Sequence, residues 1–263
     1  MRVAFRLGWW GARFAGSQRQ SGERTVEGEL IRACIRTKVF EDPNRAGFWL
    51  SGRTDRGVHA RAQVGALTTD HPERVGEVLN RALEPDVRLT GTAPVPDDWH
   101  PRYDVLFRTY RYFFANPSLD AETMARAAGR FVGEHDVSRL SRAGSRNPVR
   151  RILASGILPG EAGPVYEVTA RSFLWHQVRC MAAALEAVGR GELDEAGIDA
   201  LLSGECRRNQ PAAPADRLVL WEVGTPFPFA PVEIDPERAG GFLLATAQSH
   251  RARAGIADLL RAG

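Results

Sequence analysis

The sequence lacks most of the features that mark secreted and membrane proteins. Its three cysteines, Cys34, Cys180 and Cys206, lie far apart with no Cys-x-x-Cys pair, so neither a disulfide framework nor a cysteine zinc site is indicated. No apolar run approaches the ~20 residues that a membrane-spanning helix requires. The first residues alternate polar and apolar types instead of forming a signal-peptide core. These absences predict a cytoplasmic protein.

Lysine is almost absent, because Lys38 is the only lysine among 35 basic residues. The formal net charge is +3 and the sequence pI is about 9.0. Arginine binds phosphate through two parallel hydrogen bonds, so this composition admits a polyanionic partner, although a nucleotide bias toward arginine codons would produce it as well. The 263 residues are enough for one large or two small cores, with 43% hydrophobic and 25% charged residues in the ordinary globular range.

Hydrophobic periodicity predicts the order β-α-β-β-α-β twice along the chain. A segment with three prolines, Pro94 to Pro101, separates the two repeats and excludes regular helix. We therefore predict an α+β fold of two ferredoxin-like units, residues 1–101 and 102–240, each a split βαβ unit. The antiparallel sheets of the two units are expected side by side with a central RNA-binding cleft, because the helix-free face of such a sheet commonly receives RNA.

The predicted elements have a clear local basis. In the first unit these are a strand at 1–7, a helix with Thr25 as its N-cap, strands at 48–51 and 63–69, a helix at 75–83 and a strand at 87–92. In the second unit they are a strand at 103–114, a helix around Met124, strands at 151–158 and 165–171, a helix at 174–188, a helix around Leu201 and a strand at 218–223. Residues 241–263, with Leu243, Leu244, Ile256, Leu259 and Leu260, are expected to form a tail of one or two short amphipathic helices, at a dimer interface or in solvent.

The segment Ser51 to Ala60 carries the most unusual composition and lies between two predicted strands. Arg53 and Arg56 flank Asp55 within it. A carboxylate held among guanidinium groups stays ionised, which suits a nucleophile or a base. A tight surface turn, in which Gly52 and Gly57 supply positive φ, would explain the same pattern.

Two further segments combine arginine with aromatic residues. On the strand that contains Arg108 and Tyr110, both side chains share one side, as stacking a base and holding a phosphate on an exposed sheet face would require. Ordinary packing of aromatic residues is the alternative. Arg179 falls one position off the core stripe of its predicted helix, at the edge of the buried face. A half-buried arginine there requires a carboxylate partner. A solvated helix arginine, which needs no such partner, is the alternative.

Together these three segments resemble the TruA family of transfer-RNA pseudouridine synthases. The resemblance rests on Gly52-Arg53-Thr54-Asp55 followed by Gly57-Val58-His59-Ala60, on Arg108-Thr109-Tyr110-Arg111-Tyr112, and on Phe173-Leu174 through His176 to Val178-Arg179. The matches run in family order from about residue 9 to residue 223. The sequence departs from the family pattern at Arg56, where a small residue is usual, and at Ser17, where tryptophan is usual.

The resemblance implies a role for each matched residue. It implies that Asp55 is the catalytic aspartate, that Arg179 pairs with it, that Arg53 helps to evert the target nucleotide and that Tyr110 stacks on the target base. Arg56, His59 and Arg108 are expected to bind the RNA beside them. It further implies conversion of uridine to pseudouridine at positions 38, 39 and 40 of the anticodon stem-loop, by a homodimer that uses no cofactor and no metal.

Two other functions are compatible with the same residues. A catalytically silent tandem RNA-binding protein would use the same exposed sheets and leave its transfer RNA unchanged. A metal-dependent phosphodiesterase would use Asp55 with His59, but the other histidines show no clustered metal spacing.

Overall fold

The structure is a computed structural model that describes residues 1–204, 206, 209–234 and 236–262. The first part of the chain forms β1 (Arg2–Trp9), α1 (Val26–Arg36), β2 (Trp49–Leu50), β3 (His59–Thr68), α2 (Glu77–Ala82) and β4 (Val87–Pro94). The second part forms β5 (Phe107–Phe113), α3 (Ala121–Gly129), β6 (Gly133–Asp136), β7 (Val149–Leu158), β8 (Val165–Ala170), α4 (Gln177–Gly189), α5 (Glu195–Ser203), β9 (Leu218–Gly224), β10 (Ala230–Pro231) and α6 (Pro236–Ala262). The fold is therefore α+β, as the sequence predicts.

The strands join into one ten-stranded sheet, where the sequence analysis expected two separate sheets side by side. The order is β10-β4-β1-β3-β9-β5-β8-β7-β6, with β2 beside β3. β2 has only two residues and covers one end of β3, so the other end pairs in parallel with β9 through His59 and Ala60. This pairing satisfies backbone groups that would otherwise form two free sheet edges. The last strand pair, β10 with β4, returns the chain to the first half.

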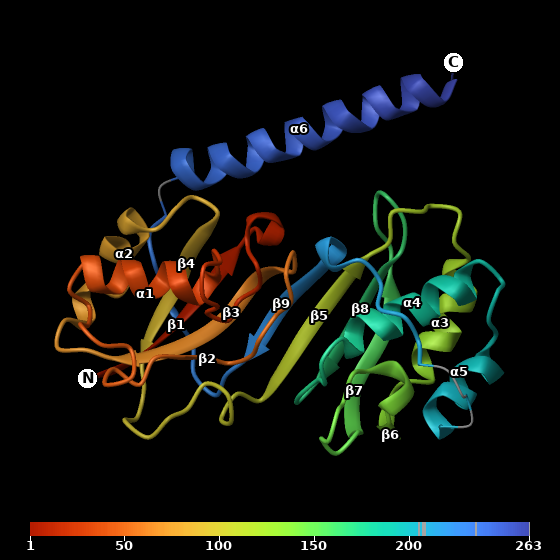
Figure 1. Cartoon of the computed structure of the whole chain (residues 1–263), viewed down its shortest axis with the longest axis horizontal. Coiled ribbons are helices and arrows are strands. Elements are labelled where there is room, and N and C mark those ends of the chain that lie inside the picture. Colours follow the sequence, from red (N-terminus) through yellow and green to blue (C-terminus); the bar gives the residue numbers. More distant parts are fainter. Residues whose placement is uncertain (205, 207–208, 235, 263) are drawn as a thin grey trace.

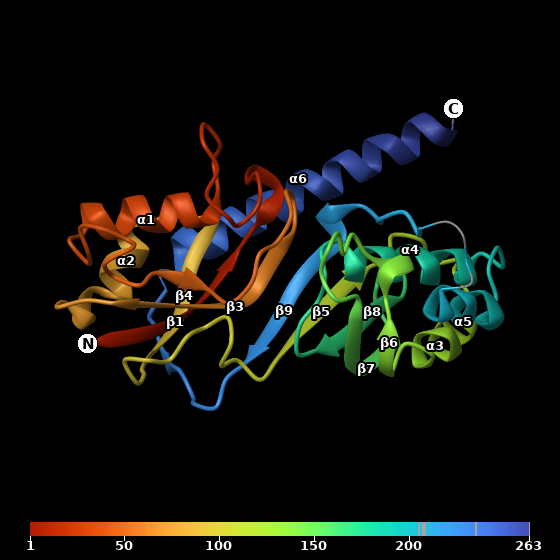
Figure 2. The same cartoon turned by 60° about the horizontal axis from the view of Figure 1, so that its bottom comes forward.

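The helices of the two halves lie on the same face of the sheet. β1 and β9 each run antiparallel to a neighbour, β3 and β5 respectively, and β3 is parallel to β9, so β1 and β5 run in the same direction. Because connections between strands cross over with the same hand, α1 and α2 cover the first half and α3 and α4 cover the second half from one side (Figures 1 and 2). Any cleft between the halves on this side is walled by helices.

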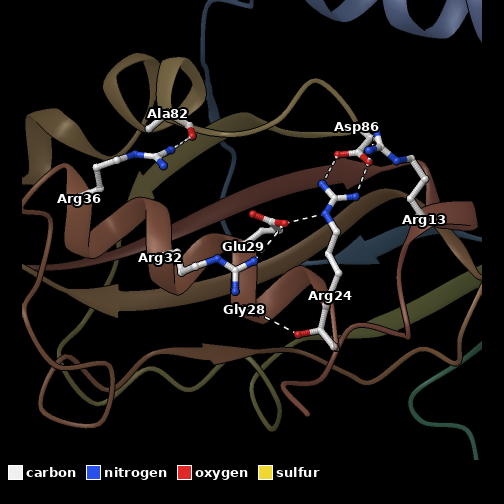
Figure 3. Close-up of polar contacts among 9 residues, drawn as sticks. Arg13, Arg24, Gly28, Glu29, Arg32, Arg36, Ala82 and Asp86 are labelled. Atoms are coloured by element: carbon white, nitrogen blue, oxygen red, sulfur yellow. Dashed lines mark hydrogen bonds and ion pairs between the residues drawn. The ribbon is translucent and has the colours of Figure 1, made fainter. Parts of the chain in front are cut away.

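Helix α1 follows the stripe and cap that the sequence predicts. Thr25 is its N-cap, with Oγ1 accepting a hydrogen bond from the Gly28 N–H at 3.2 Å. Arg24, just before it, donates to both carboxylate oxygens of the buried Asp86 at 2.7 and 2.9 Å and to Glu29 at 2.6 Å (Figure 3). This bidentate pair fastens the start of α1 to the turn that precedes β4.

The strand predicted to begin at residue 103 begins at Phe107. Residues before it form a turn, in which the His100 N–H donates to Asp104 Oδ2 at 2.7 Å and the Asp104 N–H donates to the His100 carbonyl at 3.0 Å. The short side chains that cap such turns compete with strand pairing. The strand β6 was not predicted from the sequence.

The C-terminal segment forms one helix of 27 residues, so the expectation of short helices was wrong. α6 begins near β4 and extends across the top of the molecule in Figure 1. Its His250 ring lies 5.9 Å from the ring of Trp10. The side chains of Ile256, Leu259 and Leu260 lie outside the described part of the structure. None of the described helices is both long and apolar enough to cross a membrane.

Candidate active site

A cavity of 1960 Å³ lies between the first turns of α1 and the start of α4. Tyr110 of β5 and Leu218 of β9 form part of its wall, so it sits where the two halves of the sheet meet. Ten arginines and two carboxylates, Glu27 and Asp55, line it. The cavity is therefore on the helical face of the sheet rather than on the helix-free face that the sequence analysis favoured, and its electrostatic potential suits an anion.

The loop that carries Asp55 is held in shape by the segment before α1. Thr54 and Ser17 exchange two hydrogen bonds, one from the Thr54 N–H to Ser17 Oγ at 2.8 Å and one from the Ser17 N–H to the Thr54 carbonyl at 3.1 Å. Gly16 has φ +110, and a Cβ there would lie 2.9 Å from the same carbonyl, so only glycine fits. The buried Ser17, which departs from the family pattern, thus braces the loop.

The sequence suggested that Gly52 and Gly57 in the Asp55 loop both have positive φ, and the structure confirms this for Gly57 alone. Gly57 has φ +84, whereas Gly52 is not in the left-handed region. The Val58 N–H donates to the Asp55 carbonyl at 3.2 Å, which closes the turn. The turn exposes the Asp55 carboxylate to the cavity, with 23% of its side chain accessible.

The start of α4 supplies three partners for Asp55 from the other half of the molecule. Arg179 Nη1 donates to Asp55 Oδ2 at 2.7 Å. His176 Nε2 lies 3.3 Å from the same oxygen, and Trp175 Nε1 donates to Asp55 Oδ1 at 2.9 Å. The contact between Asp55 and Arg179 that the sequence analysis predicted is found.

Arg179 is fixed by more than this ion pair. Its Nε donates to the Ala213 carbonyl at 2.7 Å, and its own carbonyl accepts from the Ala213 N–H at 3.1 Å. Its side chain is 15% exposed. The loop Pro211-Ala212-Ala213-Pro214, which precedes β9, therefore positions Arg179 toward Asp55.

His176 adopts a conformation that non-glycine residues seldom take. Its φ is +63, in the left-handed region, immediately before the first residue of α4. This backbone turns the imidazole toward Asp55 rather than along the helix. Burial lowers the pKa of His176, with Asp55 acting in the opposite direction and Arg179 in the same direction.

Tyr110 lies in the cavity wall but is not on an exposed sheet face. It is 8% exposed, and its ring packs edge-on against Phe173 with centroids 5.3 Å apart. The pKa of Tyr110 is raised to about 12, chiefly by burial, with Arg108 acting to lower it and Asp55 acting to raise it. A neutral ring next to the carboxylate is consistent with base stacking, although packing explains its burial.

Arg108 is also buried, which the hypothesis of an exposed arginine and tyrosine face did not anticipate. Its guanidinium donates to three backbone carbonyls, those of Arg171 at 2.5 Å, Ser51 at 2.6 Å and Arg102 at 3.0 Å. These bonds tie together the residue that follows β2, the loop before β5 and the loop after β8. The donors that a phosphate would need are thus already engaged.

The remaining predicted residues separate into two groups. Arg53 and Arg56 are exposed and line the cavity, and Arg56 forms an ion pair with Glu23 at 3.1 Å. His59 does not line the cavity. Its Nδ1 accepts from the Gly11 N–H at 2.9 Å and its Nε2 lies 3.1 Å from the Asp216 carbonyl, so neither nitrogen is available to a metal shared with Asp55.

Sequence reasoning did not assign a role to Trp175 or His176. Both precede Arg179 in the third motif, but they lie outside α4, and His176 has a left-handed backbone, so no helical spacing rule identifies them as partners of Asp55. Among the described residues, no group of three or more His, Cys, Asp or Glu side chains is arranged to hold a metal ion.

Known proteins resemble this chain over most of its length. Residues 127–226 match the family described as tRNA pseudouridine synthase. A tRNA pseudouridine synthase A of Methanosphaerula palustris is 53% identical over 236 residues, which are 90% of this chain and 84% of that protein. Proteins of the same name from Methanoculleus marisnigri and Thermococcus kodakarensis are 51% and 39% identical, covering 89% and 86% of this chain and 87% and 85% of those proteins.

One solved structure, the crystal structure of a Cbf5-Nop10-Gar1 complex, contains a chain that superposes with a TM-score of 0.37 at 11% identity. The superposition covers 70% of this chain and 45% of that chain. A similarity at this level does not by itself indicate a common fold.

Proposed function

The chain belongs to the tRNA pseudouridine synthase A family, whose members are isomerases, and from this membership we propose that Asp55 is its catalytic carboxylate and the anticodon stem-loop of transfer RNA its target. The observation that carries the assignment of Asp55 is its 2.7 Å contact with Arg179 inside a cavity lined by arginines. The loop and the helix that meet there come from opposite halves of the chain.

The reaction requires few groups, and the cavity contains them. The bond from ribose C1′ to uracil N1 breaks, the base turns, and C5 joins C1′; the proton lost from C5 is balanced by one gained at N1. A single carboxylate is sufficient for attack on the sugar, attack on the base or removal of a ribose proton. Asp55 is the only described carboxylate besides Glu27 that faces the cavity, and the Glu27 side chain accepts a hydrogen bond from the Arg19 N–H.

Of the two oxygens of Asp55, Oδ1 is the one we assign to the reaction. Oδ2 is held by Arg179, which is 15% exposed and anchored by Ala213. Within the described part of the chain, the hydrogen bond to Oδ1 comes from the indole of Trp175, a residue that is 59% exposed. A ribose or base entering the cavity can replace that exposed donor more easily than the anchored arginine.

The other side chains bind and orient the nucleotide. A base flipped out of a stem loses a few kcal/mol of stacking, which Tyr110 offsets by stacking on the base and Arg53 by filling the vacated space. Arg53 suits this role because it is exposed at the cavity wall two residues before Asp55. Arg56 extends the same basic wall.

We propose that the two halves are tandem ferredoxin-like units. Strand orders β4-β1-β3-β2 and β9-β5-β8-β7, each with a helix after its first and third strands, support this description. We further propose, from the resemblance of the motifs, a cytoplasmic homodimer that uses no metal or cofactor. Sedimentation of the purified protein measures its oligomeric state, and activity in the presence of a chelator tests the independence from metal.

Asp55→Asn is the test of the function, because the amide keeps the shape of the carboxylate and removes its charge. We expect nucleoside analysis of transfer RNA to show no pseudouridine formed by this variant, while its affinity for transfer RNA stays within a few-fold of the parent. Mapping the product on the RNA reports whether the anticodon stem-loop is the target. Binding without any product from the parent would instead favour a catalytically silent RNA-binding protein.

A further inference from the structure

Three aromatic rings lie next to one another beside β2, with neighbouring planes tilted by 44° and 38°, and the first and last of them line the cavity. We call Trp49, His100 and Tyr103 the aromatic rim. The ring centroids of Trp49 and His100 are 5.4 Å apart, and those of His100 and Tyr103 are 4.7 Å apart. Trp49 is 48% exposed and Tyr103 is 65% exposed, so much of the surface of both rings is open to solvent.

The aromatic rim is continuous with the cavity that contains Asp55. Trp49 and Tyr103 both line it, and so does Ser51, which follows β2 directly and begins the segment that carries Asp55. Arg102 also lines it, with its guanidinium 5.8 Å from the Tyr103 centroid. Exposed rings beside an exposed arginine therefore form part of the same cavity wall as Asp55.

A hydrogen bond and strand pairing orient two members of the aromatic rim. The Arg102 N–H donates to His100 Nδ1 at 3.1 Å, which fixes the orientation of the central ring, and Asp104 accepts from the His100 N–H. Burial lowers the pKa of His100, which favours the neutral form of the ring. Trp49 is fixed at its backbone by pairing with Ala66 of β3.

Holding large apolar rings exposed gives no stability by burial, so the rim requires a different explanation. The cavity volume of 1960 Å³ exceeds the ~300 to 1,000 Å³ typical of a site for one small ligand, so a single flipped nucleotide does not fill it. Ten arginines against two carboxylates favour a polyanion over a protein surface. Aromatic rings flanked by arginines are the usual platform for unpaired bases of RNA.

We propose that the aromatic rim is a second base-binding site, on which an unpaired nucleobase of the transfer RNA, next to the nucleotide bound at Asp55, stacks against Trp49 or Tyr103. This inference rests on the proposed function, because it takes transfer RNA as the ligand. The site selects for single-stranded RNA beside the target without reading its sequence, since every base has a face that can stack.

Ring-removing and ring-retaining variants test the proposal. The dissociation constant for an unmodified transfer-RNA transcript is measured at several salt concentrations for Trp49→Leu, Trp49→Phe, Tyr103→Leu and Tyr103→Phe. We expect each leucine variant to bind about tenfold more weakly, in keeping with the stacking of one base, and each phenylalanine variant to bind within about twofold of the parent. The slope of affinity against salt stays unchanged, because stacking releases no counterions.

Two controls distinguish stacking from general damage. Phe113→Leu changes an aromatic residue that is 40% exposed outside the cavity, and we expect it to bind as the parent does. RNA binding is expected to quench the tryptophan fluorescence of the parent more than that of Trp49→Phe. Circular dichroism and the melting temperature establish that each variant is folded.

The outcomes separate this inference from the proposed function. If the parent forms pseudouridine but the leucine variants bind as tightly as the parent, the second site is wrong and the function stands. If Trp49→Phe and Trp49→Leu lose affinity equally, the indole acts by something other than stacking, which also overturns the proposal. A parent that neither binds nor modifies transfer RNA overturns both, and loss of self-association in the leucine variants assigns the rim to a second copy of the chain.

Discussion

Two regions of the cavity differ in how their charged groups are partnered. We call the region around Asp55, Arg179 and Arg108 the inner end, and the region around Arg53 and Arg102 the outer wall. At the inner end, Asp55 and Arg179 satisfy each other, and Arg108 gives its donors to three carbonyls. At the outer wall, Arg53 and Arg102 are exposed to solvent. From this difference we infer that the groups proposed to carry the chemistry are oriented before substrate arrives, whereas the exposed arginines proposed to bind RNA can still turn their donors toward phosphate.

The largest expected effect comes from removing the partner of Asp55. Arg179→Ala leaves a partly buried carboxylate without its cation, and we expect a loss of activity of at least a hundredfold and about 2 to 3 kcal/mol of stability, below the value for a fully buried pair because Asp55 is 23% exposed. Arg179→Lys keeps the charge and loses the planar fork, so it is expected to be more stable than the alanine variant but still slow. Denaturant unfolding and single-turnover assays measure the two effects; full activity in the alanine variant would refute the preorganised inner end.

Exposed arginines at the outer wall are expected to affect affinity and its salt dependence instead. Arg53→Ala is expected to reduce the slope of log affinity against log salt by about 0.7 to 0.9, the value for one lost phosphate contact. Arg56→Ala is expected to reduce it less, since Glu23 pairs with that guanidinium. Arg126→Ala, on α3 and outside the cavity, is the matched control. Equal slopes for Arg53→Ala and the control would place Arg53 away from the RNA.

Trp175 shares features of the inner end and of the outer wall, because it bonds to Asp55 and is 59% exposed. The effect of substituting it shows with which region it acts. Trp175→Phe keeps an aromatic ring and removes the hydrogen bond to Oδ1 that entering RNA must break. We expect transfer RNA to bind a few-fold more tightly, in line with the ~0.5 to 1.5 kcal/mol net value of one hydrogen bond, with activity retained. A loss of activity greater than tenfold would show that the indole stays on Asp55 during the reaction and belongs to the inner end.

The smallest expected effect is the pH dependence of stability that His176 contributes. Burial lowers its pKa in the folded protein, so between that pKa and about 6.5, the ordinary value, the unfolded chain binds more protons than the folded one. The free energy of unfolding therefore rises with pH across this window. His176→Asn, which tolerates the left-handed backbone, is expected to show a weaker rise in melting temperature there. An identical pH profile would show that His176 does not titrate in this way.

Local chemistry determined much of this molecule from the sequence alone. The glycine-flanked Asp55 loop between two strands, the Thr25 cap and the offset of Arg179 from the core stripe of its helix were all predicted correctly. Each depends on residues within a few positions of one another, so spacing and side-chain type are sufficient. The α+β class followed from the same short-range periodicity.

Which residues these groups contact depends on how distant segments of the chain pack together. Trp175 and Arg179 contact Asp55 although 120 and 124 residues separate them from it in the sequence. The guanidinium of Arg108 donates hydrogen bonds to backbone carbonyls of three separate segments. β3 pairs with β9, and this pairing joins the two halves into one sheet. It is possible because the short β2 pairs with only one end of β3 and leaves the backbone groups at the other end available. Periodicity determines which side of an element is buried; the partner on that side is chosen by packing and hydrogen bonding over the whole chain, which no local pattern contains.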